Sequence, residues 1–167
     1  MKDLRRITIN CRKGTVFIID YSDILLEKNF DYNLKSIING ITFILEDSKQ
    51  YRKELLLKLI EMLHESNRIM YIGKRNITLD NDIAYKNVKD TDIKSLKDVV
   101  NTSNVNILII NDFQYLLNSN SETVFSLLKD LNEEGLTIVV ALKMSDADEI
   151  IFPMIESIGS IILVAEK

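Results

Sequence analysis

Five short runs of apolar residues are the feature that most constrains how this chain of 167 residues can fold. Each run is nearly continuous in apolar side chains and rich in Ile and Val, and the runs lie at residues 41–45, 69–72, 107–110, 137–142 and 161–165. Parallel strands that are covered on both faces have this composition, whereas strands with one wet face alternate apolar and polar residues. The runs therefore predict a buried, mainly parallel sheet of five strands.

Helical patterns separate these runs. Residues 53–65 and 122–134 place their apolar side chains at helical spacing, and residues 91–100 do so over a shorter stretch. Gly135 follows the second pattern, where a left-handed cap is expected, and Ser145 could cap a last helix that Pro153 limits. Alternating strands and helices imply right-handed crossovers, so the predicted fold class is α/β, a three-layer sandwich.

The first forty residues follow a different pattern. Residues 7–10 and 15–20 flank Arg12-Lys13-Gly14 and predict an N-terminal β-hairpin packed at the sheet edge. We therefore expect one domain over residues 1–167, with a hairpin extension at 1–35 and a core at 36–167. Residues 80–92 are polar and predict a loop.

Composition excludes several classes of protein. Apolar residues make up 46% of the chain and charged residues 28%, which is typical of a soluble globular protein. Cys11 is the only cysteine, so an intramolecular disulfide and a zinc site built on cysteines are excluded, as suits a reducing compartment. No apolar run is long enough for a signal peptide or a membrane span. The expected location is cytoplasmic.

Charge is distributed unevenly along the chain. Residues 1–75 carry 14 Lys and Arg against 10 Asp and Glu, whereas residues 76–167 carry 7 against 15. The first part is therefore mildly basic and the second acidic. This asymmetry could support head-to-tail association or an acidic surface for a partner, although solvated faces that bind no partner are the favoured interpretation. A net charge of −4 is unlike that of a protein that binds nucleic acid through bulk charge.

The segment after the first strand has the spacing of a Walker A loop, G-x-x-x-x-G-K-[ST], between a strand and a long helix. In ungapped alignment, Glu46 and Tyr51 replace the two glycines, Arg52 replaces the lysine and Lys53 the Ser or Thr. Side chains at the glycine positions obstruct an amide-lined phosphate loop, and Glu46 and Asp47 add negative charge there. Lys53 lacks the hydroxyl that holds magnesium, and the forked guanidinium of Arg52 does not replace a lysine's point charge.

The third strand and its tip, ILIINDFQYL, resemble a Walker B segment, four apolar residues followed by an acid. Asn111 stands where the magnesium-associated aspartate is expected, and a neutral amide holds Mg²⁺ indirectly at best. Asp112 takes the next position, which in such proteins is often the catalytic acid. We therefore predict no metal ligand here and name Asp112 as the catalytic residue only if the site is active.

Together these segments resemble the P-loop NTPase superfamily, in particular the RecA/KaiC-like and DnaA-like ATPase cores, over residues 36–167. In those families the tip of the fourth strand carries a sensor residue, and Lys143 or Ser145 is nearest to it. The resemblance implies a degenerate P-loop at Glu46, Asp47, Tyr51, Arg52 and Lys53, with no ATP or magnesium required. Another doubly wound fold, such as a flavodoxin-like one, is the alternative.

Few other residues suggest chemistry. His64 is the sole histidine and is expected to be a surface residue, since nothing with metal-ligand spacing accompanies it. Arg5, Arg6, Arg12 and Lys13 form a basic cluster that could contact a phosphate or an acidic partner, although a solvated hairpin face is the favoured interpretation.

Three functions remain open. The leading hypothesis is a catalytically inactive NTPase-like adaptor that acts through protein–protein contacts beside an ATPase, for example in DNA replication or recombination, or as a homo-oligomer. The second is a weak or atypical ATP hydrolase that uses Arg52, Lys53 and Asp112. The third is a nucleic-acid-binding accessory protein that uses the N-terminal basic cluster.

Overall fold

The computed structural model describes residues 7–10, 15–20, 40–74, 83–117 and 120–165. Its eight strands are β1 (Ile7–Asn10), β2 (Thr15–Asp20), β3 (Ile41–Leu45), β4 (Ile69–Gly73), β5 (Ala84–Asn87), β6 (Ile107–Ile110), β7 (Thr137–Leu142) and β8 (Ser160–Ala165). Its helices are α3 (Lys49–Leu63), α4 (Ile93–Thr102), α5 (Gln114–Leu117), α6 (Ser121–Glu133) and α7 (Ile151–Ile158), and two 3₁₀ turns are η1 (Val88–Asp90) and η2 (Met144–Asp146).

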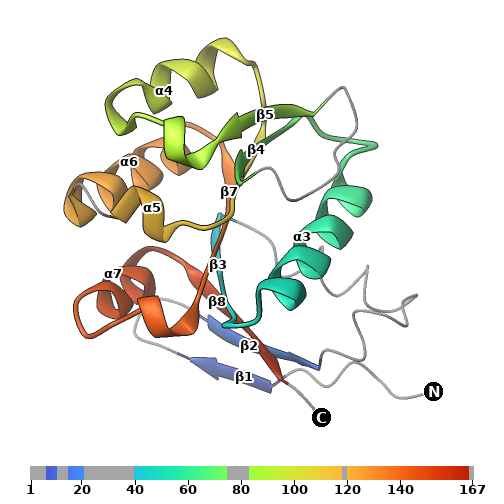
Figure 1. Ribbon diagram of the computed structural model, residues 1–167, viewed down its shortest axis with the longest axis vertical. Coiled ribbons are helices and arrows are strands. Elements are labelled where there is room, and N and C mark those ends of the chain that lie inside the picture. The colour runs from blue at the N-terminus through green and yellow to red at the C-terminus, as the bar shows by residue number, and fades with distance from the viewer. Residues whose placement is uncertain (1–6, 11–14, 21–39, 75–82, 118–119, 166–167) are drawn as a thin grey trace.

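All eight strands form one sheet in the order β1-β2-β8-β3-β7-β6-β4-β5 (Figure 1). The pair β1 and β2 is antiparallel, and every other neighbouring pair is parallel. The predicted hairpin is thus confirmed as an antiparallel pair, and β2 joins it to the edge of the parallel sheet through β8.

The parallel core has six strands beside the hairpin, so the prediction of five was wrong. The additional strand is β5, which lies within the segment that was expected to be a loop. Its sequence, AYKN, is short and polar, and all four residues are partly exposed because the strand lies at the sheet edge and pairs with β4 alone. An edge strand of this kind lacks the apolar run by which the other strands were predicted from the sequence.

Helices cover both faces of the sheet, as the α/β pattern predicts (Figure 1). Alternate residues of one strand enter two different apolar clusters. Phe43 and Leu45 pack into the cluster that contains α4, α5, α6 and α7, whereas Ile44 packs into the cluster that contains Leu55, Leu56 and Leu59 of α3. The strands are buried on both sides for this reason, which explains their continuous apolar runs.

The strand order excludes a flavodoxin-like sheet. In that fold the first strand lies between the second and third, in the order 2-1-3-4-5. Here the first core strand, β3, lies between β8 and β7, the last two strands of the chain. Gly135, with φ of 104°, adopts the left-handed conformation that was predicted after α6.

Among the described residues, no helix is both long and apolar enough to span a membrane.

Candidate functional site at the carboxyl edge of the sheet

The carboxyl edge of the sheet brings together three segments that are far apart in the sequence. The segment 46–48 follows β3, Asn111 and Asp112 follow β6, and Lys143 to Ser145 follow β7. Because β7 lies between β3 and β6, its tip lies between the other two. The chain leaves β3 towards one face of the sheet and leaves β6 and β7 towards the other. In open α/β sheets, ligands bind beyond the carboxyl ends of the strands where neighbouring connections diverge in this way.

Arg52 occupies the inside of the β3–α3 loop. Its side chain is 2% exposed, although it stands in the second turn of a helix. The Nη1 atom donates to the carbonyl oxygens of Glu46, at 2.6 Å, and Asp47, at 3.1 Å. The Nη2 atom lies 3.9 Å from Oδ1 of Asp112, an ionic contact that is too long for a direct hydrogen bond. The guanidinium therefore binds the loop backbone and faces a buried carboxylate.

The amide groups around this loop donate to its own side chains. Ser48 N–H donates to the Glu46 carboxylate at 3.0 Å, and Tyr51 N–H donates to Ser48 Oγ at 3.2 Å, so Ser48 is the N-cap of α3. Across the edge, Ser145 N–H donates to Oδ1 of Asp47 at 3.1 Å and fastens η2 to the loop. In a phosphate-binding loop, amides such as these point at the anion. Here the carboxylates of Glu46 and Asp47 and the hydroxyl of Ser48 accept from them instead.

Asn111 is fully engaged with its neighbours and is 2% exposed. Its Nδ2 donates to the Tyr71 hydroxyl at 3.1 Å, its Oδ1 accepts from Asp112 N–H at 2.9 Å, and its own N–H donates to the Ile72 carbonyl at 2.7 Å. The side-chain oxygen that could have approached a cation is thus turned to the backbone of the next residue. No group of three or more His, Cys, Asp or Glu that could hold a metal ion occurs among the described residues.

Asp112 combines burial with a strained backbone. It is 4% exposed, and its φ of 55° lies in the left-handed region that non-glycine residues seldom adopt. Its Oδ2 has no hydrogen-bond partner within the described segments, and neither has Nε of Arg52. A buried polar atom without a hydrogen-bond partner costs free energy. Strained backbone conformations of this kind occur preferentially at functional sites.

Tyr71 is the centre of the polar contacts on the β4 side of the site. Its ring stacks on Tyr85 with centroids 6.1 Å apart, and Tyr85 Oη donates to the Gly73 carbonyl. A Cβ atom at Gly73 would lie 2.6 Å from the Tyr71 hydroxyl, so glycine provides the space in which that hydroxyl reaches Asn111. Burial raises the pKa of Tyr71 well above its usual range, and the nearby Asp112 carboxylate raises it further.

The raised pKa of Tyr71 predicts a loss of stability in alkali. Since the pKa in the folded protein exceeds the unfolded value of 10.0, the contribution of the neutral phenol is complete below pH 10 and is lost as the pH rises above it. The free energy of unfolding should then fall by up to about 1.4 kcal/mol for each further pH unit. Urea unfolding of the wild type and of Tyr71→Phe between about pH 9 and pH 11 checks this. Equal slopes for the two proteins would contradict it.

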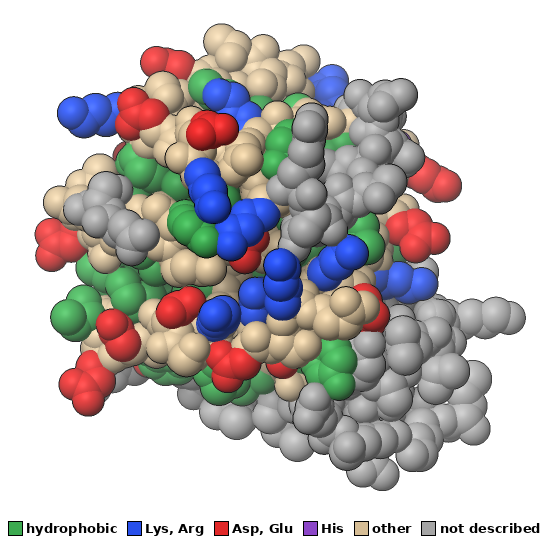
Figure 2. Space-filling model, in the orientation of Figure 1, with side chains coloured by type: hydrophobic (Ala, Val, Ile, Leu, Met, Phe, Trp, Pro, Cys, Tyr) green, Lys and Arg blue, Asp and Glu red, His purple; other side chains and the backbone are tan. Residues whose placement is uncertain are grey.

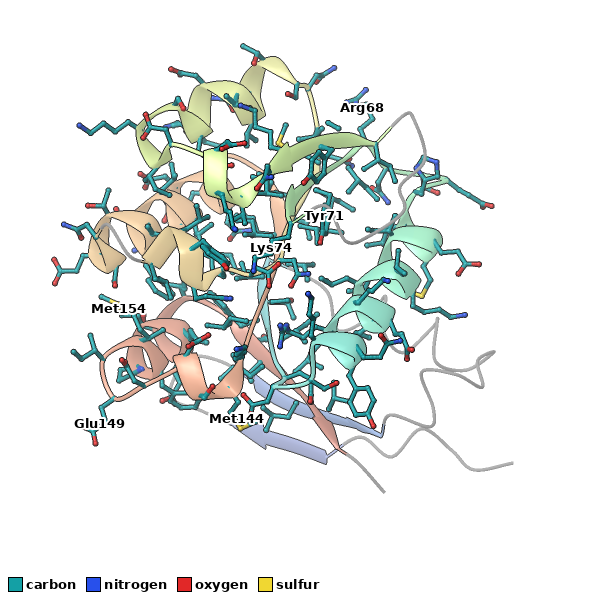
Figure 3. All side chains as sticks on the ribbon, in the orientation of Figure 1. Arg68, Tyr71, Lys74, Met144, Glu149 and Met154 are labelled. Atoms are coloured by element: carbon teal, nitrogen blue, oxygen red, sulfur yellow. The ribbon has the colours of Figure 1, made fainter. Side chains whose placement is uncertain are left out.

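Two lysines converge on one aromatic ring beside this site. Nζ of Lys74 lies 4.6 Å from the centroid of the Tyr115 ring, and Nζ of Lys89 lies 5.6 Å from it, both within cation–π range. A hydrogen bond between Lys74 and Tyr115 raises the pKa of the lysine and lowers the pKa of the tyrosine. Lys74, Lys89 and Tyr115 are called the lysine–tyrosine cluster below. Figure 3 labels Lys74 and Tyr71.

Only some of the site residues predicted from the sequence lie together in the structure. Glu46, Asp47, Arg52, Asn111 and Asp112 meet at the carboxyl edge, as the strand order requires. Tyr51 reaches the loop through its backbone amide, and Lys53 lies partly buried in α3. Ser145 contributes its backbone N–H, and Asp148 rather than Ser145 accepts from the first amides of α7. His64 is the C-cap of α3, at the opposite end of the helix.

Other predictions lie outside the part of the chain that the structure describes. They concern Arg5, Arg6, Arg12 and Lys13, and these residues stay candidates on the sequence alone. Conversely, the sequence did not indicate Tyr71, Lys74, Lys89 or Tyr115. The Lys74 position is visible as a polar residue directly after a strand, but its pairing with Tyr115 depends on the neighbouring positions of β4 and β6.

A hollow of about 210 Å³ lies at the opposite, amino edge of the sheet, between the C-terminal ends of α4 and α6. Its lining is made of amides, one carboxylate and a few apolar side chains, among them Asn101, Asn104, Asn106 and Glu134. It shares no residue with the carboxyl-edge site, which is built around buried charges.

Searches of the sequence against protein-family models and against curated proteins found no match.

Proposed function

We propose that this protein is a catalytically inactive NTPase-like adaptor that acts through protein–protein contacts, in a DNA-related or other macromolecular assembly beside an ATPase. The observation that carries the proposal is the position of the Arg52 guanidinium, which fills the β3–α3 loop and donates to the Glu46 and Asp47 carbonyl oxygens. A loop whose carbonyl oxygens point to its centre binds a cation and not an anion. Here the cation is the Arg52 guanidinium of the protein itself.

A phosphate group would have to displace several contacts at once to enter this loop. It would have to separate Arg52 from two carbonyl oxygens and from Asp112, and it would have to release the amides of Ser48 and Ser145 from their carboxylate acceptors. Asp112 would then remain buried without its cationic neighbour, which costs several kcal/mol by order of magnitude. The carboxylates of Glu46 and Asp47 would also repel the incoming anion.

Two features support the relationship to P-loop NTPases as part of the proposal. The positions aligned with Walker A and Walker B, at Arg52 and Asn111, come to the same edge of the sheet through the helices expected between them. The strand tip that the resemblance assigns to a sensor residue, after β7, lies between them and touches the loop through Ser145. A protein of this fold can keep its protein-binding surfaces after its nucleotide site has been lost, and the proposed adaptor role rests on such surfaces.

One observation favours the second candidate, a weak or atypical ATP hydrolase. Asp112 keeps a strained backbone and an unpartnered Oδ2 among the described residues, and a carboxylate of this kind could orient a water molecule. That role requires the Arg52 side chain to leave the loop and meet a phosphate. Nucleotide binding therefore distinguishes the two candidates.

Titration with labelled ATP and Mg²⁺ tests the proposal. We expect no saturable binding with a Kd below about 100 μM for the wild type, because the loop is already filled. Arg52→Ala and Arg68→Ala serve as a matched pair, since Arg52 is buried in the loop and Arg68 is exposed at the start of β4. Tighter binding by the wild type that is lost in Arg52→Ala and kept in Arg68→Ala would contradict the inactive site and favour the hydrolase candidate.

A further inference from the structure

The segment between β7 and α7 exposes two large apolar side chains. Met144 is 44% exposed and Ile150 is 70% exposed, and they are the two exposed large hydrophobic residues among those that the structure describes. Both lie within residues 144–151, which we call the η2–α7 segment. Isolated surface leucines or isoleucines are common, but two such side chains in one eight-residue segment indicate a contact surface.

This segment is held in place by hydrogen bonds. Ser145 N–H donates to Asp47 at 3.1 Å, and Oδ1 of Asp148 accepts from the amides of Ile150 and Ile151 at 2.9 Å each. Asp146, Asp148 and Glu149 belong to the same segment, and Asp148 and Glu149 are exposed. The η2–α7 segment thus carries exposed apolar and acidic side chains on a hydrogen-bonded backbone, which limits the entropy that binding must overcome.

The lysine–tyrosine cluster has the complementary chemistry. It offers two ammonium groups around a partly exposed aromatic ring, against the carboxylates and apolar side chains of the η2–α7 segment. Apolar and thioether groups pack well against an aromatic ring, and ammonium groups pair with carboxylates. The carboxyl edge of the sheet therefore carries two chemically complementary features.

The strand order places the two features on opposite halves of that edge. The η2–α7 segment follows β7 and leads to β8, whereas Lys74 follows β4 and Lys89 follows β5, with β6 between the halves. Figure 3 shows Met144 and Glu149 at a distance from Lys74. In Figure 2, Lys and Arg side chains gather across the middle of this face, and acidic side chains lie around them on all sides.

We propose that the carboxyl edge binds a second copy of this chain about a two-fold axis that passes between the two halves. Rotation about such an axis exchanges the halves, so the η2–α7 segment of each copy meets the lysine–tyrosine cluster of the other. A surface that carries both members of a complementary pair is self-complementary, which an isologous dimer requires. The inference deepens the adaptor function and rests on it, since the dimer covers the loop filled by Arg52.

The test is the molar mass of the full chain in solution, measured by sedimentation equilibrium at about 100 μM protein, where a dimer with a Kd of about 10 μM would predominate. The wild type should have twice the monomer mass. Ile150→Asp and Lys89→Glu should each weaken association at least about ten-fold, through lost apolar burial and through like-charge contact. Lys129→Glu on α6, also exposed, is the matched control and should leave the mass unchanged.

A charge exchange within one chain tests the two-fold arrangement. Glu149→Lys should weaken the dimer as Lys89→Glu does, and the chain that carries both substitutions should regain association, because each new lysine then faces a new glutamate on the other copy. A monomeric wild type, or a dimer that Ile150→Asp and Lys89→Glu leave within about two-fold of the wild-type Kd, would overturn the proposal. Failure of the double variant to recover would overturn the two-fold pairing.

The outcome is separable from that of the ATP titration. If the protein is a monomer and does not bind ATP, the dimer proposal is contradicted and the adaptor proposal is not. A dimer that binds ATP tightly removes the inactive site and leaves the interface standing.

Discussion

Replacement of Arg52 by methionine should lower the free energy of unfolding by about 3–5 kcal/mol, because it leaves the Asp112 carboxylate buried without its cation. The Glu46 and Asp47 carbonyl oxygens also lose their donor. The side chain is 2% exposed, so water replaces these interactions poorly. Urea denaturation at neutral pH measures the difference.

Two comparisons identify the cause of that loss. Arg68→Met removes an exposed arginine and should change the free energy of unfolding by less than about 0.5 kcal/mol. Adding Asp112→Asn to Arg52→Met removes the stranded charge and keeps a residue that tolerates positive φ, so the double variant should be more stable than Arg52→Met alone. A loss below about 1 kcal/mol in Arg52→Met would show that the guanidinium is not the support of this loop.

Phe43→Ala should cost about 3–5 kcal/mol, the second large effect. Phe43 stands in the middle of β3 with no exposed surface, and its ring contacts Phe125, at 5.9 Å between centroids, and Phe113, at 6.3 Å. The Gly159 backbone also lies against the ring, since a Cβ there would be 2.9 Å from it. Neighbours held this tightly cannot collapse into the cavity, which gives the upper part of the range.

Thermal and urea unfolding check this second prediction, with Phe43→Leu and Phe152→Ala as comparisons. Phe43→Leu fills most of the volume and should cost clearly less than Phe43→Ala. Phe152 on α7 is only partly buried, so its loss should also cost less. Equal losses for Phe43→Ala and Phe152→Ala would mean that the three-ring contact does not organise this side of the core.

The sheet was largely predictable from the sequence because its central strands are buried on both faces. The runs at 41–45, 107–110 and 137–142 coincide with β3, β6 and β7. Burial on both faces favours apolar residues at nearly every position, so these strands stand out in the sequence as apolar runs. β5 was missed because an edge strand is defined by its backbone pairing with β4, and its side chains carry little of that information.

The location of the candidate site was predictable from the sequence, but the contacts of its side chains were not. Spacing alone indicated that Arg52 and Asn111 would approach the same edge, because parallel strands end there together. The direction of the Arg52 side chain could not be inferred, since it depends on the path of the loop, which turns the Glu46 and Asp47 carbonyl oxygens inwards. Asp112 shows the same limit, because its positive φ results from the tertiary contacts around it, such as the bond from Phe113 N–H to the Ala141 carbonyl.

Amide NMR during addition of ATP·Mg²⁺ shows whether the β3–α3 loop is filled by the protein's own side chains. The amides of Ser48, Tyr51 and Ser145 donate to side chains of the protein, and Asp112 N–H donates to Asn111. We predict that their chemical shifts stay unchanged up to about 5 mM nucleotide, a concentration that would saturate any site with a Kd below about 100 μM. Saturable shifts confined to these amides, with a Kd in that range, would contradict the account.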